Sequence, residues 1–431
     1  MKEKQLAKMR KNNMKLYPMY RIVGADWIFF YGVKVLFLTQ VKNISPANIV
    51  LAGSIYAFSY IVFQIFSMIL VEKIGKKRSI VLGQTLKFIA MLIIIYCPNF
   101  WWLLASSVFK AAGNCLKAIS ESTLLNASIP TTKRKGDIFS KIDGKGYSKY
   151  CFFGATSLLI SGFLYSINPY IPIILCLIVN FLAIAISANF VDIEKITSNT
   201  ENKRSIKEEA IYILKDLKES FKFILTSKRL KALFLMQGLI WGIIDVYATY
   251  QETLLKELNI PSYYIGFMLA GFQMLVGVFS TKANKFNKKH KNHTLTYIGL
   301  MLTIGSIILG ITTILHIPFE IQLMIITFVF ILRAYSKGVY QILKKRYTNN
   351  FSDSKILPKL YSANGMTSNL GKGIIGLIAS TVLNITVLPN ALLIMGIICL
   401  AMVLVVAIYS KSRLGLKPEE YSKKDISYAG D

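Results

Sequence analysis

The sequence predicts an all-α membrane protein with twelve transmembrane helices arranged as two pseudo-symmetric six-helix bundles. Three observations lead to this fold class. Of the 431 residues, 54% are hydrophobic and 17% are charged, whereas a soluble domain has about 25% charged residues. The apolar residues gather in twelve runs, each near the roughly 20 residues that a helix needs to cross a bilayer. Positive charge lies almost entirely in alternate connections between these runs.

The predicted spans follow from the apolar runs. They cover residues 22–40, 48–71, 79–96, 101–122, 147–165, 169–189, 230–254, 262–281, 295–316, 320–342, 360–383 and 389–409. Several connections are very short, such as residues 97–99. Helices that follow one another must therefore be antiparallel neighbours.

The placement of Lys and Arg predicts the topology. A net charge of +29 in a soluble protein would point to nucleic acid. Here 40 of the 51 basic residues lie in the two tails and after the even-numbered spans, while the opposite side carries only Lys42 and Lys256. This is the positive-inside pattern. We therefore expect a multi-pass plasma-membrane protein with both termini in the cytoplasm. Its partner is then the lipid bilayer, and we expect no nucleic-acid partner.

The longest polar stretch, residues 190–229, separates six spans from six. It predicts an N-terminal bundle over 1–189 and a C-terminal bundle with a cytoplasmic tail over 230–431. Apolar residues recur at helical spacing in the second part of the linker. We expect an amphipathic helix lying on the cytoplasmic membrane face; a solvated helical linker is the alternative.

The two halves share a short sequence pattern. EKIGKKR follows span 2 at residues 72–78, and NKFNKKH follows span 8 at residues 284–290. Both segments come after the second helix of a half. Parallel halves related by an axis along the membrane normal are one transporter design.

The segment after span 2 resembles a loop motif of the major facilitator superfamily, G-x-x-x-D-R-x-G-R-[R/K]. Met68 replaces its first glycine, and Glu72-Lys73 replaces Asp-Arg, whereas Gly75 and the basic Lys76 are kept. The resemblance implies a conformational latch made by Glu72, Lys73, Gly75 and Lys76, with Glu72 near the N-terminus of span 11, where backbone N–H groups favour an anion. A tight basic turn that only follows the charge rule is the alternative.

Span 4 carries a second resemblance. Lys110-Ala111-Ala112-Gly113 is similar to the R-x-x-G of the family, and small residues such as Gly154 and Gly162 in span 5 permit close packing. Span 5 has no Gly-Pro pair, so it does not match the antiporter motif of the family. The resemblance implies a central cavity lined by spans 1, 4, 7 and 10.

Ionisable side chains at membrane depth are costly and are therefore functional candidates. The deepest basic residues are Lys34, Lys110, Arg333 and Lys372. Asp245 is central, Glu252 lies nearer the outer end, and Asp26 and Glu121 lie nearer the cytoplasm. We expect Lys87, Lys149 and Lys231 to reach the cytoplasmic interface and to have no role.

Helical spacing places several of these residues on shared faces. The stripes fall on the four helices expected to line the cavity: Tyr31 and Lys34 in span 1, Lys110 and Asn114 in span 4, Trp241 and Asp245 in span 7, and Arg333 in span 10. We predict that substrate contacts Lys34, Lys110, Arg333, Asn114, Tyr31 and Trp241.

The cations Lys110, Arg333 and Lys34 would attract a carboxylate, phosphate or sulfonate. Alternatively, Asp245 and Glu252 neutralise two of them as interhelical ion pairs. Asp245 is also a candidate proton-coupling carboxylate, with Glu252 as the second. Burial raises the pKa of a carboxyl group and a nearby lysine lowers it, so its protonation state could follow the alternating conformations.

The predicted function is secondary active transport of a small polar or anionic organic solute by alternating access, coupled to protons. The alternative is an efflux pump for amphipathic drugs or toxic metabolites. We expect no enzymatic activity, no metal and no cofactor, because metal-type spacing and a G-x-x-x-x-G-K-[S/T] loop are both missing. We expect the chain to act as a monomer.

Overall fold

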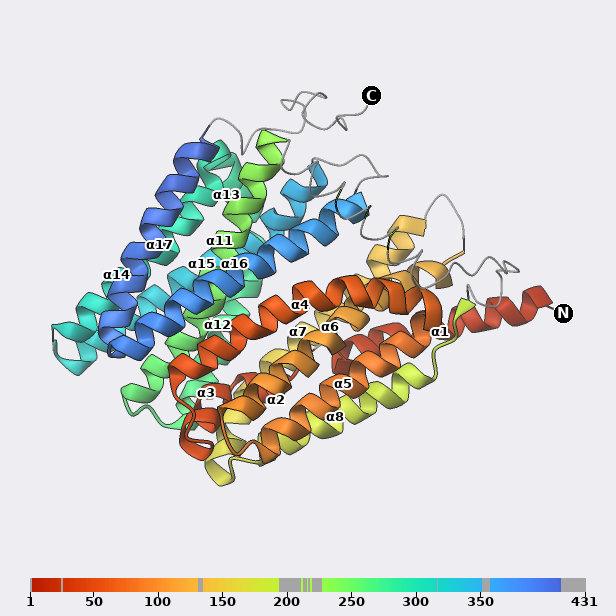
Figure 1. Cartoon of the computed structure of the whole chain (residues 1–431), viewed down its shortest axis with the longest axis horizontal. Helices are drawn as coiled ribbons and strands as arrows, with labels where there is room; N and C mark the ends of the chain where they lie inside the picture. The colour runs from red at the N-terminus through yellow and green to blue at the C-terminus, as the bar shows by residue number, and fades with distance from the viewer. Residues whose placement is uncertain are drawn as a thin grey trace. The chain divides into compact units, whose positions relative to one another are not determined.

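The structure, a computed structural model, describes residues 2–24, 26–130, 135–193, 227–315, 317–350 and 357–411, with positions 211, 215 and 218. Across these residues all regular secondary structure is helical, as Figure 1 shows. The amphipathic helix expected in the 190–229 linker falls almost wholly outside the described residues.

Up to residue 193, the described residues form eight α-helices and one π-helical turn. They are α1 (Lys2–Gly24), α2 (Ile28–Tyr31), α3 (Lys34–Leu36), η1 (Phe37–Val41), α4 (Pro46–Ile74), α5 (Lys76–Tyr96), α6 (Phe100–Ser128), α7 (Lys135–Ile167) and α8 (Ile171–Ala188).

The second part continues with seven α-helices and one short 3₁₀ turn. They are α11 (Lys228–Glu257), α12 (Ser262–Ser280), α13 (Ala283–His290), η2 (Lys291–His293), α14 (Thr294–Ile314), α15 (Phe319–Asn350), α16 (Leu357–Ile385) and α17 (Leu388–Ser410).

Every predicted span coincides with helix, but the predicted count of twelve is not confirmed. Among the described residues, nine helices are long and apolar enough to cross a membrane, and a bent pair over Lys4–Tyr31 and Lys34–Val41 makes ten. The predicted spans 101–122 and 360–383 are helical, as α6 and α16, without meeting that criterion. In α6 the reason is visible in the sequence, because Lys110, Lys117 and Glu121 interrupt its apolar residues.

The chain divides into two compact units. Unit 1 comprises residues 1–43, 59–214 and 261–270, and unit 2 comprises residues 44–58, 215–260 and 271–431. In unit 1, α5 packs along α6 and α8, and α1 packs along α7. In unit 2, α14 packs along α17 and α15, and α11 packs along α16.

Span 1 is broken rather than continuous. Helix α1 ends at Gly24, and the short helix α2 starts at Ile28. A bend of 52° then separates the part of the chain that ends at Tyr31 from the part that starts at Lys34. Trp27 leaves the helical conformation at φ −83° and ψ 66°, and its N–H donates to its neighbour Asp26 Oδ1 at 3.0 Å. The prediction of one uninterrupted helix over 22–40 is therefore wrong. A break inside a span is tolerated where side chains satisfy the exposed backbone groups.

The basic N-terminal segment is itself helical and packs into unit 1. Tyr17 and Tyr20 of α1 are buried in an apolar cluster with Leu125 and Phe190. The fully buried Asn13 Nδ2 donates to Ser128 Oγ at 2.9 Å and to the Val191 carbonyl at 2.7 Å. Helix α1 thus connects the ends of α6 and α8.

The two related basic segments adopt different structures. After α4 the chain turns at Gly75, whose φ of 88° favours glycine, and α5 starts at once. After α12 the corresponding residues form the separate helix α13, which buries Phe286. The second segment has asparagine where the first has Gly75. The shared sequence frame therefore does not produce a shared turn.

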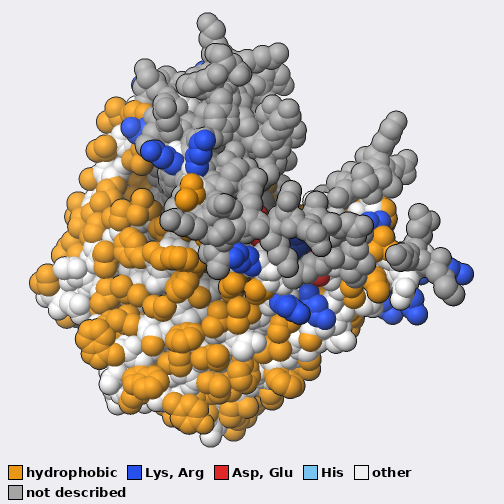
Figure 2. Space-filling model, turned by 45° about the vertical axis from the view of Figure 1, so that its right-hand side comes forward, with side chains coloured by type: hydrophobic (Ala, Val, Ile, Leu, Met, Phe, Trp, Pro, Cys, Tyr) orange, Lys and Arg blue, Asp and Glu red, His pale blue; other side chains and the backbone are white. Residues whose placement is uncertain are grey.

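The surface agrees with a lipid environment. Figure 2 shows hydrophobic side chains over most of the visible described surface. Large apolar residues such as Phe66, Phe152 and Ile408 are more than half exposed. Exposed apolar surface on this scale is unusual for a soluble monomer and is expected for a membrane protein.

Helices α5 and α6 approach each other through two glycines. A Cβ added to Gly113 would lie 2.5 Å from the Gly83 carbonyl oxygen, and one added to Gly83 would lie 2.7 Å from the Gly113 oxygen. Gly113 ends the Lys110–Gly113 motif, so that motif contains a packing requirement. Backbone atoms cannot move aside as a flexible side chain can.

We expect Gly113→Ala to lower the thermal stability of the purified protein because the added methyl group forces α5 and α6 apart. Overpacking of this kind costs about 1–3 kcal/mol. Gly144→Ala in α7 is the matched control, because nothing lies within 4 Å of the added Cβ. Equal melting temperatures for the two variants would contradict the close α5–α6 contact.

Candidate functional site

The break in span 1 places three side chains of unit 1 around one lysine. Lys110 Nζ, from α6, donates to Tyr31 Oη at 3.0 Å and lies 3.8 Å from Asp26 Oδ1. It also lies 3.9 Å from the centre of the Trp27 ring. Tyr31 Oη donates in turn to Asp26 Oδ2 at 3.1 Å. We call Asp26, Trp27, Tyr31 and Lys110 the Lys110 cluster.

The Lys110 cluster is partly accessible. The side chains of Lys110 and Asp26 are 14% and 29% exposed, and Tyr31 is exposed. The Trp27 ring is buried, and its Nε1 atom has no hydrogen-bond partner among the described residues. A buried N–H without a partner calls for an explanation. The cluster therefore offers one ammonium group, one hydroxyl and one indole donor, beside a carboxylate.

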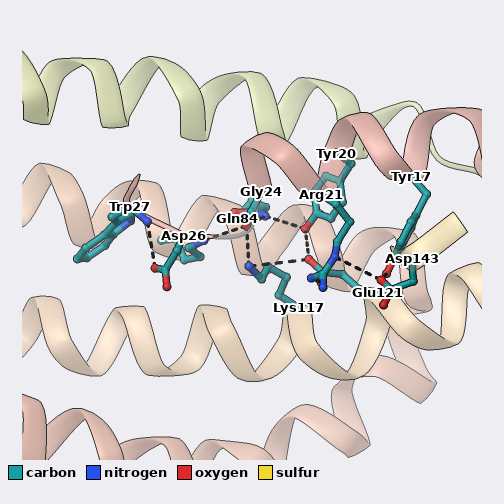
Figure 3. Close-up of polar contacts among 11 residues, drawn as sticks. Tyr17, Tyr20, Arg21, Gly24, Asp26, Trp27, Gln84, Lys117, Glu121 and Asp143 are labelled. Atoms are coloured by element: carbon teal, nitrogen blue, oxygen red, sulfur yellow. Dashed lines mark hydrogen bonds and ion pairs between the residues drawn. The ribbon is translucent and has the colours of Figure 1, made fainter. Parts of the chain in front are cut away.

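A second cluster surrounds the last carbonyl of α1. The Gly24 oxygen accepts hydrogen bonds from Lys117 Nζ at 2.6 Å, Gln84 Nε2 at 2.9 Å and Lys87 Nζ at 3.1 Å. Figure 3 shows Lys117 and Gln84 converging on Gly24. The C-terminal end of a helix attracts positive charge, so donors from α5 and α6 stabilise the end of α1. We call Lys87, Lys117, Gln84 and Gly24 the Gly24 cluster.

Glu121 extends the Gly24 cluster toward the start of α7. Tyr20 Oη donates to Glu121 Oε1 at 2.6 Å, and Arg21 Nη1 lies 3.3 Å from Glu121 Oε2. Lys117 Nζ lies 3.9 Å from the same carboxylate. Arg21 Nε is also 3.4 Å from Asp143 of α7. Figure 3 shows this continuous chain of polar contacts across α1, α6 and α7.

Lys87 differs from its expected behaviour. The sequence places it close enough to a cytoplasmic end to extend toward water, yet the side chain is fully buried and holds the Gly24 carbonyl. That prediction is wrong because the end of α1 at Gly24 provides an acceptor inside unit 1. Lys149 is exposed, as an interfacial lysine would be.

In unit 2, Arg333 of α15 contacts α11. Its Nη1 donates to Gln251, and its Nη2 donates to the Ile244 carbonyl at 3.1 Å. A small cavity adjoins this arginine and is otherwise largely apolar; Tyr247, Met301 and Phe330 are among the lining residues. One turn further along α15, Lys337 Nζ lies 3.4 Å from Gln273 of α12.

Asp245 forms an ion pair across α11 and α16. Its Oδ1 lies 3.0 Å from Lys372 Nζ, which also sits 4.9 Å from the centre of the Tyr56 ring. The Asp245 side chain is 39% exposed and that of Lys372 is 15% exposed. A deep interhelical ion pair therefore exists in unit 2, and its cation is Lys372.

Trp241 is held between aromatic and basic groups of unit 2. Its ring stacks on Tyr340 at 6.3 Å, and Lys344 Nζ lies 5.1 Å from its centre. The Gln237 Nε2 group, one turn earlier on α11, donates to the Lys344 carbonyl at 3.3 Å. Trp241 remains half-buried.

Of the six predicted substrate-binding residues, Lys110 and Tyr31 are in direct contact. Lys34, Asn114 and the coupling candidate Glu252 are half-buried. In the predicted latch, Glu72 and Lys73 are exposed, Gly75 is buried and Lys76 is half-buried. The backbone N–H of the next residue, Lys77, donates to Asp192 Oδ2 at 3.4 Å.

Two features of these sites could not be read from helical spacing. The Gly24 carbonyl became an acceptor only because span 1 breaks, and Asp26 became the counterion of Lys110 for the same reason. A signal was present in Gly24-Ala25-Asp26, since glycine followed by an aspartate that can cap the next turn favours a break. Within the described residues, no group of three or more His, Cys, Asp or Glu side chains could hold a metal ion.

Comparison with known proteins agrees with the fold. The solved structures of the nucleoside transporter NupG and of a POT family transporter in complex with 5-aminolevulinic acid superpose with TM-scores of 0.68 and 0.66. They cover 96% and 94% of this chain and 100% and 96% of their own, at 10% and 14% identity. At such identities the likeness concerns the fold alone.

A sequence relative is the uncharacterized MFS-type transporter YxaM of Bacillus subtilis (strain 168), 23% identical over 278 residues. The match covers 63% of this chain and 66% of the relative, just under two thirds of its length. The model of the Major Facilitator Superfamily matches residues 16–343, which is most of the chain. The protein is thus a multi-pass membrane protein, and it belongs to the major facilitator superfamily, a family of transporters.

Proposed function

We propose that this protein moves a small polar or anionic organic solute across the plasma membrane by alternating access, coupled to protons. The two bundles would be residues 1–189 and 230–431, with both termini cytoplasmic, as the distribution of basic residues indicates. The observation that carries the proposal is the Lys110 cluster, a partly accessible lysine held by Tyr31 and Asp26 at a break in span 1.

The donors of the Lys110 cluster favour a solute with an anionic or strongly polar group. Lys110 Nζ already has Asp26 at 3.8 Å, a longer separation than a direct hydrogen bond. An incoming carboxylate or phosphate would compete with Asp26 for this ammonium group. It could also accept from the indole Nε1 of Trp27, which has no partner among the described residues. The exposed ring of Tyr31 would contact the apolar part of the solute.

Asp245 is our candidate for proton coupling. Protonation of its carboxyl group would remove the charge that holds Lys372 at 3.0 Å and would free the lysine to move. The Asp245 side chain is 39% exposed, so its carboxylate is not sealed within unit 2. Glu252, two turns along α11, remains the second candidate.

We also propose that Glu72, Lys73, Gly75 and Lys76 form a conformational latch. Gly75, with its φ of 88°, allows α4 to turn directly into α5 and so fixes Glu72 and Lys76 on either side of the turn. Glu72 would engage the N-terminus of span 11 in one state of the transport cycle and release it in another.

The experiment that tests the function is flux into proteoliposomes containing the purified protein. We expect saturable uptake of at least one organic anion, nucleoside or amino acid, driven by an imposed proton gradient. Candidates come from a ligand screen by thermal stabilisation. Stabilisation by cationic amphipathic drugs alone, with outward transport, would favour the efflux alternative. Non-saturable conductance would contradict a transporter.

We expect Lys110→Ala to weaken the affinity for an anionic ligand about 10- to 100-fold, because a hydrogen bond to a charged group is worth about 1.5–3 kcal/mol. Lys110→Arg should retain part of the affinity, since it keeps the charge. Lys149→Ala, at an exposed position of α7, is the control. Ligand-induced thermal stabilisation measures the affinities. If Lys110→Ala and Arg333→Ala bind every anion as wild type does, the anion hypothesis fails.

We expect Asp245→Asn to abolish accumulation driven by a pH gradient while leaving exchange of labelled for unlabelled solute, because an amide cannot carry the coupled proton. Glu257→Gln, at an exposed position near the end of the same helix, should accumulate solute normally. Proteoliposomes with an acidic exterior provide the measurement. Unchanged pH-driven accumulation in Asp245→Asn would assign the coupling to another group.

A further inference from the structure

Two buried lysines of unit 1 share one acceptor. Lys87 Nζ and Lys117 Nζ lie 3.1 and 2.6 Å from the Gly24 carbonyl oxygen, so the two nitrogens are separated by less than about 6 Å. Lys87 is 0% exposed and Lys117 is 6% exposed. Two ammonium ions so close together repel each other, and burial strengthens this repulsion because water does not screen it.

The charged groups around the pair come from every neighbouring element. Helix α1 contributes Arg21 and the phenol of Tyr20, the break contributes Asp26, and α6 contributes Lys110 and Glu121. Helix α7 adds Asp143, which binds Arg21, whereas the buried polar residues of α8 are the uncharged Cys176, Asn180 and Ser187.

Among these groups, cations outnumber carboxylates. Arg21, Lys87, Lys110 and Lys117 face Asp26, Glu121 and Asp143. Asp26 lies beside Lys110, and Asp143 lies beside Arg21. Glu121 is shared by Arg21, Lys117 and the Tyr20 hydroxyl. An additional buried positive charge would cost several kcal/mol, and a lysine avoids this cost by releasing a proton.

We infer that Lys87, held with Lys117 on one buried carbonyl oxygen, is an exchangeable proton site at the break in span 1. Lys87 can alternate between an ammonium group and a neutral amine, and either form can donate an N–H to the Gly24 oxygen. Uptake of the proton breaks no bond other than the N–H or O–H bond of its donor, such as water.

The site lies at a position that can affect the Lys110 cluster. Gly24 is the last residue of α1, and Asp26 and Trp27 follow it in the break. A second positive charge on the lysine pair would loosen its hold on the Gly24 carbonyl and draw Asp26 away from Lys110. This consequence rests on the proposed transport function, whereas the proton site itself does not.

The test is thermal unfolding of the purified full chain in lipid nanodiscs, without substrate, from pH 6 to pH 9. In the unfolded chain both lysines are protonated over this range, so the folded protein binds one proton fewer. Stability contributed by the pair should therefore rise with pH. The difference in stability between Lys87→Met and wild type should favour the variant most at pH 6. This difference should shrink toward pH 9, by up to a tenfold change in the ratio of the two unfolding constants per pH unit.

A lysine pair that is always doubly charged gives a different result. Lys87→Met would then change the stability by the same amount at every pH, and that result would overturn the inference. Lys149→Met, at an exposed position of α7, should follow the wild-type pH dependence. If Lys87→Met does not fold, Lys87→Arg serves instead, because arginine keeps its charge. Its deficit should be greatest at pH 9, and a constant deficit would contradict the proton site.

The flux assay separates this inference from the proposed function. Pair-dependent stability in a protein that transports nothing would keep the proton site and reject transport. If the protein transports solute but its stability shows no contribution from the lysine pair, the transport function is kept and the proton site is rejected. When both hold, Lys87→Arg should also shift the pH profile of uptake, whereas Lys149→Arg should not.

Discussion

The hydrogen bonds to the Gly24 carbonyl are the constraint on which the sites of unit 1 depend. A helix that ends inside a membrane span leaves carbonyl groups that lipid cannot satisfy. Here Lys87 and Gln84 from α5, with Lys117 from α6, donate to that carbonyl. Because these donors replace the missing helical hydrogen bonds, α1 can end at Gly24 and the next residues can bring Asp26 to Lys110. The close contact of Gly83 with Gly113 brings α5 near enough to α6 for this arrangement.

Both units place a carboxylate from the first predicted span of a half beside a lysine and an aromatic ring. Asp26 of span 1 has Lys110 at 3.8 Å, and Asp245 of span 7 has Lys372 at 3.0 Å. Trp27 lies against the first lysine and Tyr56 against the second. A lysine covered by a ring needs less compensation from its carboxylate than one buried alone. In the proposed mechanism, substrate would therefore compete for Lys110, and protons for Asp245.

Much of the helical layout could be predicted from sequence, because long apolar runs leave few alternatives. All twelve predicted spans contain helix, although span 1 is broken and α6 and α16 are too polar to count by hydropathy. The sites were harder to predict. Helical spacing reports only the faces of one helix, whereas Gly24 meets partners 60 to 93 residues away. Lys87 looked interfacial because its depth was judged only from its place near the cytoplasmic end of span 3. The segment 284–290 does not form the turn seen at Gly75, because it has asparagine at the corresponding position.

The basic residues of this chain serve different physical purposes. Those between the spans orient the chain, and their distribution can be counted without a structure. Those inside unit 1 must be compensated one at a time, because a buried charge without a counterion is costly. Replacing a buried ion pair by apolar groups is often neutral or stabilising. An apolar side chain at position 87 would remove that cost, yet the chain has a fully buried lysine there. The hydrogen bond to the Gly24 carbonyl gives a reason for a polar donor at position 87, and the proposed proton site gives a reason for an ionisable one.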